Sequence, residues 1–256
     1  MCASDMAAGL DVAVAHAGSA SLRHSAPPRK LMCPLLLATL LACTLGQAQP
    51  VETDARPWVL RHGDDSTPTR VYLRDRGGQA PEFRAEGRMR TTLGALAAVL
   101  MDTEHMPEWV YRTRSAQRLS GEGALQGVSR VVTAMPPPLS DREAFVAWQW
   151  SQDAVTRTVT LQGRADPTPR PPTEGLVRMP DFASRWVFAP RADGDIDVRF
   201  EGHADLGGNL ARWPLNAFVA AAVWQAPLYT LDALRERVGR APYAGARVPF
   251  IDEPVR

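Results

Sequence analysis

Residues 209–228, NLARWPLNAFVAAAVWQAPL, predict a helix that is apolar on both faces. At helical spacing one face carries Leu215, Phe218, Val219, Ala222 and Val223, and the opposite face carries Ala217, Ala220, Ala221 and Trp224. A helix that is apolar all round has to be enclosed. Pro214 and Pro227 interrupt the run and leave it too short for a bilayer, which takes about 20 apolar residues. Its second face must therefore be covered by more protein or by a molecule that the protein carries.

Length and composition place the chain among ordinary globular proteins. It has 256 residues, of which 45% are hydrophobic and 22% are charged, enough for one good-sized domain or two small ones. The formal net charge is +1, so the sequence offers no basic surface for nucleic acid.

The first 48 residues predict a leader outside the fold. Arg29 and Lys30 precede an apolar run over residues 31–45, which ends in the small-x-small pattern of residues 46–48. A positive flank, a short apolar core and such an ending are typical of a signal peptide, so we expect export to the periplasm or the medium. A membrane anchor is the alternative, and LLAC at residues 40–43 resembles a bacterial lipobox that would place a lipid on Cys43.

The chemistry-bearing residues of the expected mature chain are sparse. The three cysteines of the full sequence, Cys2, Cys33 and Cys43, all lie within the leader, which leaves the expected mature chain without a disulfide or a thiol nucleophile. His62, His105 and His203 lie on unrelated segments, without metal-site spacing. No nucleophile elbow surrounds Ser140, and no phosphate-binding loop is present. We therefore predict no catalytic residue, no metal site and no cofactor.

Alternating segments predict many antiparallel strands and few helices. Residues 69–75 and 82–90 form a hairpin pattern, and residues 93–100 have helical spacing. The further strand candidates are residues 111–119, 128–135, 144–152, 155–162, 184–190 and 195–203. One long helix follows the last strand, which gives an α+β pattern. A sheet folded around that helix is one way to bury both of its faces.

Three segments together resemble the START domain, the steroidogenic acute regulatory protein-related lipid transfer family, in its bacterial, single-domain type. They are LMDTEHMPEWV (residues 100–110), PPPLSDREAFV (residues 136–146) and DLGGNLARWPLNAFV (residues 205–219). Their order and spacing are similar to that family across residues 58–238. The resemblance implies a START-like domain over residues 49–240, with residues 241–256 as a C-terminal tail.

The resemblance implies a helix-grip fold, in which a curved antiparallel sheet wraps around the C-terminal helix and encloses an apolar tunnel. Family members hold one lipid or other apolar molecule there, so the expected function is lipid binding or transfer by a monomer in transient contact with membranes. The implied tunnel residues are Met135, Arg142, Phe145, Trp148, Trp186, Leu215, Phe218, Val219, Ala221, Ala222 and Val223. Two alternatives remain open: a cyclase- or hydrolase-like helix-grip enzyme with an apolar substrate, and a structural module without a ligand.

Two details of the implied tunnel are left open by the sequence. Along AFVAWQW, Phe145 and Ala147 share one strand face while Val146 and Trp148 share the other, and both faces are largely apolar. Arg142 is either a tunnel-mouth residue or half of a solvated ion pair with Asp141, worth under about 1 kcal/mol. The helix alanines likewise suit either an open tunnel or close packing on the sheet.

Overall fold

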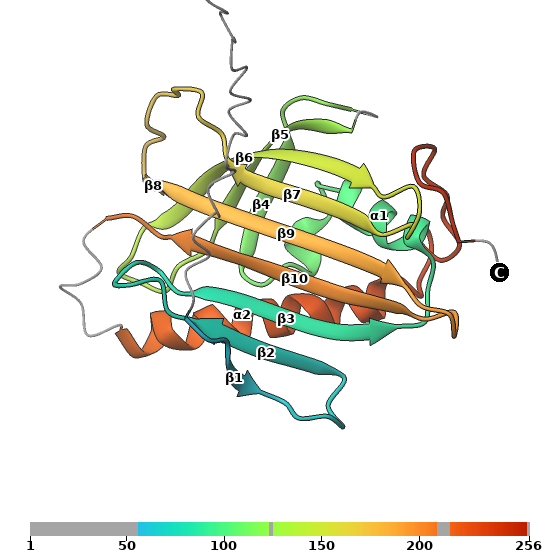
Figure 1. Cartoon of the computed structure of the whole chain (residues 1–256). Helices are drawn as coiled ribbons and strands as arrows, with labels where there is room; N and C mark the ends of the chain where they lie inside the picture. The colour runs from blue at the N-terminus through green and yellow to red at the C-terminus, as the bar shows by residue number, and fades with distance from the viewer. Residues whose placement is uncertain (1–55, 123–124, 209–215, 255–256) are drawn as a thin grey trace, which may run out of the picture. The chain divides into compact units, whose positions relative to one another are not determined.

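The computed structural model describes residues 56–122, 125–208 and 216–254, with side chains of the last helix from Ala221 onward (Figure 1). The described residues form one compact unit. Its strands are β1 (Val59–His62), β2 (Thr69–Arg74), β3 (Glu82–Met89), β4 (Thr113–Arg118), β5 (Gln126–Thr133), β6 (Asp141–Gln152), β7 (Val159–Ala165), β8 (Leu176–Arg178), β9 (Asp181–Pro190) and β10 (Ile196–Asp205). Its helices are α1 (Leu93–Met101), the short 3-10 turn η1 (Met106–Glu108) and α2 (Asn216–Arg237).

The strands form a single sheet in the order β1-β2-β3-β10-β9-β7-β6-β5-β4, and every neighbouring pair along this path is antiparallel. The short β8 pairs with β6 in parallel. Helix α2 runs along one side of the sheet and packs mainly on β2 and β3 (Figure 1). The predicted α+β class and the curved antiparallel sheet with a C-terminal helix are thus confirmed. No helix in the described ranges is both long and apolar enough to cross a bilayer.

The predicted elements lie close to the observed ones, with one instructive displacement. The strand expected over residues 155–162 is observed as β7, which begins only at Val159. The Asp153 carboxylate accepts hydrogen bonds from the backbone N–H of Val155 at 2.9 Å and of Thr156 at 2.6 Å, which closes a tight turn there. Such side-chain bonds compete with strand pairing, so the strand begins further along the chain. The short strands β1 and β8 were not predicted.

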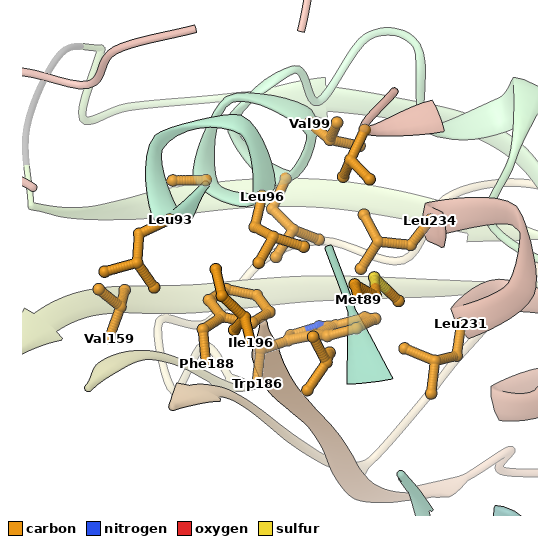
Figure 2. Packing of buried hydrophobic residues seen from close by; sticks show 14 of the residues in the cluster. Met89, Leu93, Leu96, Val99, Val159, Trp186, Phe188, Ile196, Leu231 and Leu234 are labelled. Carbon is orange, nitrogen blue, oxygen red and sulfur yellow. The ribbon is translucent and has the colours of Figure 1, made fainter. Parts of the chain in front are cut away.

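The core lies between α1, the sheet and the C-terminal half of α2. Thr92 caps α1, because its side-chain oxygen accepts from the backbone N–H of Ala95 at 3.1 Å. Figure 2 shows side chains of α1, the sheet and α2 packed in one cluster: Leu93, Leu96 and Val99 from α1; Met89, Val159, Trp186, Phe188 and Ile196 from strands; and Leu231 and Leu234 from α2. These side chains fix α1 and the second half of α2 against the same sheet face.

The segment after α2 packs onto this core, although the sequence places a tail there. Tyr243 and Val248 are buried members of the core cluster. The carboxylate of Glu253 accepts from the backbone N–H groups of Leu93 at 3.1 Å and Gly94 at 2.8 Å, at the start of α1. A Cβ on Gly94 would lie 2.4 Å from the carbonyl oxygen of Ala246, so the close approach of this segment requires glycine. The folded region therefore continues beyond residue 240.

We expect Glu253→Ala to lower the free energy of unfolding by about 0.5–2 kcal/mol, the usual cost of losing a helix N-terminal cap. The carboxylate accepts two otherwise unpaired N–H groups and faces the positive end of the helix dipole, so its loss removes both effects. Thermal melting would show a fall of several degrees. The exposed Glu174 provides the matched control, and an equal fall for Glu174→Ala would contradict the capping role.

Candidate ligand cavity

A cavity of about 230 Å³ lies between the inward face of β4–β7, β9 and β10 and the connection from α1 to β4. Its wall is mostly aliphatic and aromatic. Four tryptophans line it, Trp109, Trp148, Trp150 and Trp186, together with aliphatic and sulfur-containing side chains such as Leu100, Met106, Val131, Val146, Leu161 and Met179. The surface of the cavity is thus mostly hydrocarbon.

Strand alternation decides which residues reach the cavity. Along β6, Ala144, Val146, Trp148 and Trp150 point inward, and along β9 the same holds for Phe182, Ser184 and Trp186. The residues between them face the other side of the sheet. The predicted site residues Trp148 and Trp186 therefore lie in the cavity wall.

Two other predicted site residues of the sheet region, Phe145 and Met135, lie outside that wall. Phe145 faces the opposite side of the sheet, where the guanidinium carbons of Arg170 and Arg178 each lie 4.5 Å from its ring centroid. Val146, the next residue of β6, lines the cavity instead, because neighbouring strand residues face opposite sides of the sheet. Met135 is buried beside the β5–β6 connection and is not among the residues that line the cavity.

Arg142 is buried at the start of β6, away from the cavity wall. Its Nε donates to the carbonyl oxygen of Leu206 at 2.9 Å, and another of its N–H groups donates to the carbonyl oxygen of Ser140. Only 2% of the residue is exposed, and burial lowers the pKa of its guanidinium. The solvated ion pair with Asp141 does not form; Asp141 instead lies 2.6 Å from Arg114. Arg142 therefore ties β6 to the turn after β10.

The described side chains of α2, from Ala221 onward, include few of the residues that line the cavity. Ala221, Ala222 and Val223 are half-buried and are not among the residues that line the cavity. Trp224, beside them, stacks on His62 at 5.9 Å between ring centroids. Among the described side chains of α2, Thr230 lines the cavity. The predicted residues Leu215, Phe218 and Val219 lie outside the described side chains.

Arg118, which the sequence did not single out, brings a charge to the cavity wall. It ends β4 and lies with its guanidinium carbon 4.9 Å from the ring centroid of Trp148. Thr113, at the start of β4, also lines the cavity. If the side chains of β4 alternated regularly from Thr113, Arg118 would face away from the cavity. A register shift between Thr113 and Ser115 reverses the alternation, so Arg118 points inward. A bulge of this kind leaves no clear signal in the sequence.

A separate polar cluster joins the end of α1 to the segment after α2. Nδ1 of His105 lies 2.7 Å from Asp102, and the Tyr243 hydroxyl donates to the other oxygen of Asp102 at 2.5 Å. Burial works to raise the pKa of Asp102, but the hydrogen bonds from Tyr243 and His105 outweigh it and hold that pKa below its ordinary value. Burial and the nearby Asp102 raise the pKa of Tyr243. None of these three residues lines the cavity.

This cluster predicts a pH-dependent contribution to stability. The hydrogen bond and charge of Asp102 raise the pKa of His105 above its ordinary value of 6.5, so the folded state favours the protonated ring. The contribution is complete below the ordinary value and is lost as the pH rises through the raised pKa. We expect His105→Ala to lower the melting temperature more at pH 5.5 than at pH 8.5. A loss of equal size at both pH values would contradict a protonated His105.

The described residues hold no group of three or more His, Cys, Asp or Glu side chains that could bind a metal ion. Within the described cavity wall the polar side chains are Arg118, Tyr111 and the hydroxyls of Thr103, Thr113, Ser129, Thr133, Ser184 and Thr230. A wall of this kind can enclose an apolar molecule and hold one polar group of it.

Comparison with known proteins identifies the family. The START domain model matches residues 41–235, so the chain belongs to the START domain family. A STAR-related lipid transfer protein of Xanthomonas axonopodis is 26% identical, with a TM-score of 0.62 over 72% of this chain and 99% of that one. An uncharacterised protein of Pseudomonas aeruginosa is 26% identical over 71% of this chain and 86% of its own length.

Human structures share the fold at lower identity. Human STARD10 is 16% identical, with a TM-score of 0.59 over 72% of this chain and 74% of that one. Human StAR-related lipid transfer protein 5 is 17% identical, with a TM-score of 0.58 over 73% of this chain and 88% of that one. A ligand-binding domain of the START type is therefore the class that the fold and these relatives define.

Proposed function

We propose that this protein binds one apolar molecule in the cavity and carries it, as a lipid-binding or lipid-transfer protein. The observation that supports the proposal most is the cavity of about 230 Å³ walled by four tryptophans and aliphatic side chains. Each buried methylene contributes about 0.8 kcal/mol. About ten of them would approach the roughly 8 kcal/mol that corresponds to micromolar affinity, before the cost of ordering the ligand.

The cavity volume favours a slender ligand. Pockets for small molecules usually measure about 300–1,000 Å³, and about 230 Å³ lies just below that range. A single alkyl chain or a compact ring system suits this space better than a phospholipid with two chains.

The polar groups of the wall favour carriage over catalysis. General acid–base chemistry uses His, carboxylate or a similarly tuned group, and a hydroxyl nucleophile needs a neighbouring base. The described wall offers hydroxyls and one guanidinium but no His or carboxylate. We therefore propose a non-enzymatic role.

The proposal is tested by extracting the purified protein with organic solvent and analysing the extract by mass spectrometry. We expect one apolar molecule in stoichiometric amount, and saturable binding of a fluorescent lipid after that molecule has been removed. Recovery of no such molecule, together with no binding of fluorescent lipids, would contradict the proposed function.

We also propose that the protein is exported and acts as a monomer in transient contact with membranes. The leader pattern of residues 29–48 supports export. Mass spectrometry of the mature N-terminus distinguishes the routes, because a chain that begins at Gln49 excludes the lipoprotein on Cys43. Light scattering during size-exclusion chromatography would check the monomeric state. A transfer assay between donor and acceptor vesicles would check the transient contact with membranes.

A further inference from the structure

We propose that the ligand carries an anionic oxygen head group, a carboxylate or a phosphate, and that Arg118 receives it inside the cavity. This inference rests on the proposed function and narrows it to a class of amphiphile. Its starting point is a cation in a wall that otherwise consists of apolar side chains, hydroxyls and indoles.

The guanidinium of Arg118 is held by neutral groups alone. It donates to the carbonyl oxygen of Met101, to the side-chain oxygen of Thr103 at 3.3 Å and to the carbonyl oxygen of Gly121 at 3.4 Å. These bonds all involve its two terminal nitrogens, so N–H groups remain among the five that an arginine carries. In the described part of the chain no carboxylate forms an ion pair with Arg118. Arg130 and Arg178, by contrast, both form ion pairs with the buried Glu143.

The surroundings of Arg118 fix its position and offer further donors. Its guanidinium lies over Trp148, whose indole N–H donates to the side-chain oxygen of Ser129 at 3.1 Å. Ser129 is the cross-strand partner of Arg118 and is itself buried, and its hydroxyl hydrogen stays available to a ligand. A charge held over an aromatic ring and between carbonyl oxygens is oriented before any ligand arrives.

Trp109 supplies an independent second observation. Only 7% of it is exposed, it lines the same cavity, and its indole N–H has no hydrogen-bond partner among the described residues. A buried donor left unpaired costs free energy, so such a group in a ligand cavity suits an acceptor on the ligand. The cation of Arg118 and the hydroxyl of Ser129 therefore lie in the wall as donors for an acceptor-rich head group, with the unpaired N–H of Trp109 on a residue of the same wall.

The charge of Arg118 predicts a selectivity between head groups on the same chain. Hydrogen bonds to charged groups contribute more than neutral ones, by an amount equivalent to roughly 10-fold in affinity. A carboxylate or phosphate can also accept two parallel bonds from one guanidinium, which an alcohol cannot.

The test compares dodecanoic acid, dodecyl phosphate and dodecanol, each displacing a neutral fluorescent probe from the delipidated full chain. We expect at least one of the two anions to bind roughly 10-fold or more tightly than the alcohol, and the tighter anion identifies the head group. Arg118→Gln should bring both anions to the level of dodecanol while dodecanol itself binds as before. Arg118→Lys should keep part of the preference, since it retains the charge but loses the planar fork.

Trp109→Phe is the second variant, because it keeps the ring and removes only the N–H group. We expect it to weaken all three ligands by a few fold, since an uncharged donor serves either kind of oxygen. Equal binding of all three ligands by the wild type, or an equal loss for all three in Arg118→Gln, would overturn the inference while leaving the proposed function intact. Binding of none of them by the wild type would instead contradict the proposed function.

Discussion

Val146→Trp is expected to reduce the affinity for a single-chain lipid by more than 10-fold while the protein stays folded. Val146 points into the cavity from the middle of β6, and an indole there would occupy space that the ligand needs. Filling a void displaces no packed atoms, so the melting temperature should change little. If the site were closely packed instead, the same change would cost about 1–3 kcal/mol. Paired melting and lipid-titration measurements separate these outcomes.

Ala147→Trp is the matched control for Val146→Trp. Ala147 is the next residue of the same strand and faces the opposite side of the sheet, where it borders a surface groove. We expect this variant to bind lipid as the wild type does. Loss of binding in Ala147→Trp with intact binding in Val146→Trp would mean that the ligand lies on the other face of the sheet.

Among the substitutions proposed for this protein, Glu143→Ala is expected to lower the free energy of unfolding the most. Its side chain is 1% exposed, and its carboxylate accepts from Nε of Arg130 at 2.6 Å, from Arg178 at 2.9 Å and from the Thr173 hydroxyl at 3.0 Å. Burial works to raise the pKa of Glu143, but the bonds from Arg130, Thr173 and Arg178 outweigh it and hold the pKa below its ordinary value. Removing one partner of a buried ion pair costs about 3–5 kcal/mol.

We expect a value near the lower end of that range, because the side chains of Arg130 and Arg178 are about a third exposed and can turn to water. A loss of about 3 kcal/mol corresponds to a fall of roughly 6–12 °C in the melting temperature of a domain of this size. The surface pair of Glu236 and Arg240, exposed by 70% and 72%, is the control. Glu236→Ala should cost under about 1 kcal/mol, and an equal fall for both variants would contradict the buried role of Glu143.

The acid side of the stability profile provides an independent check on Glu143. A carboxylate whose pKa is lowered by folding stabilises the protein above its ordinary pKa of 4.5. That contribution is lost as the pH falls through the lowered value. The difference in melting temperature between wild type and Glu143→Ala should therefore shrink in acid. A difference that grows as the pH falls would contradict the charged state.

The fold was largely predictable because its elements carry strong local patterns. Alternation marked most strands, and the three family-like segments implied a curved antiparallel sheet around the helix. The elements that were not predicted are short or depend on distant partners. β8 has three residues and exists through its pairing with β6, and the segment that carries Tyr243 and Glu253 is ordered by contacts with α1. Contacts between residues so far apart in sequence have no local signature.

The site was less predictable than the fold because its lining depends on which way each strand faces. The resemblance implied Trp148, Trp186 and Phe145 alike as tunnel residues, and the sequence left open which face of the strand points inward; Phe145 faces the arginines of the opposite side. Arg118 was missed because a bulge in β4 reverses its direction. The apolar helix α2 contributes Thr230 to the described wall.

Titration of the delipidated protein with a bromine-substituted fatty acid tests the central claim most directly, because bromine quenches indole emission only at close contact. Among the tryptophans that the structure describes, four line the cavity. The account predicts that much of the tryptophan emission is lost by one molar equivalent and then levels off, and that Val146→Trp removes this effect. Quenching that is absent, or that rises steadily without levelling off in the folded wild type, would contradict a lipid bound in this cavity.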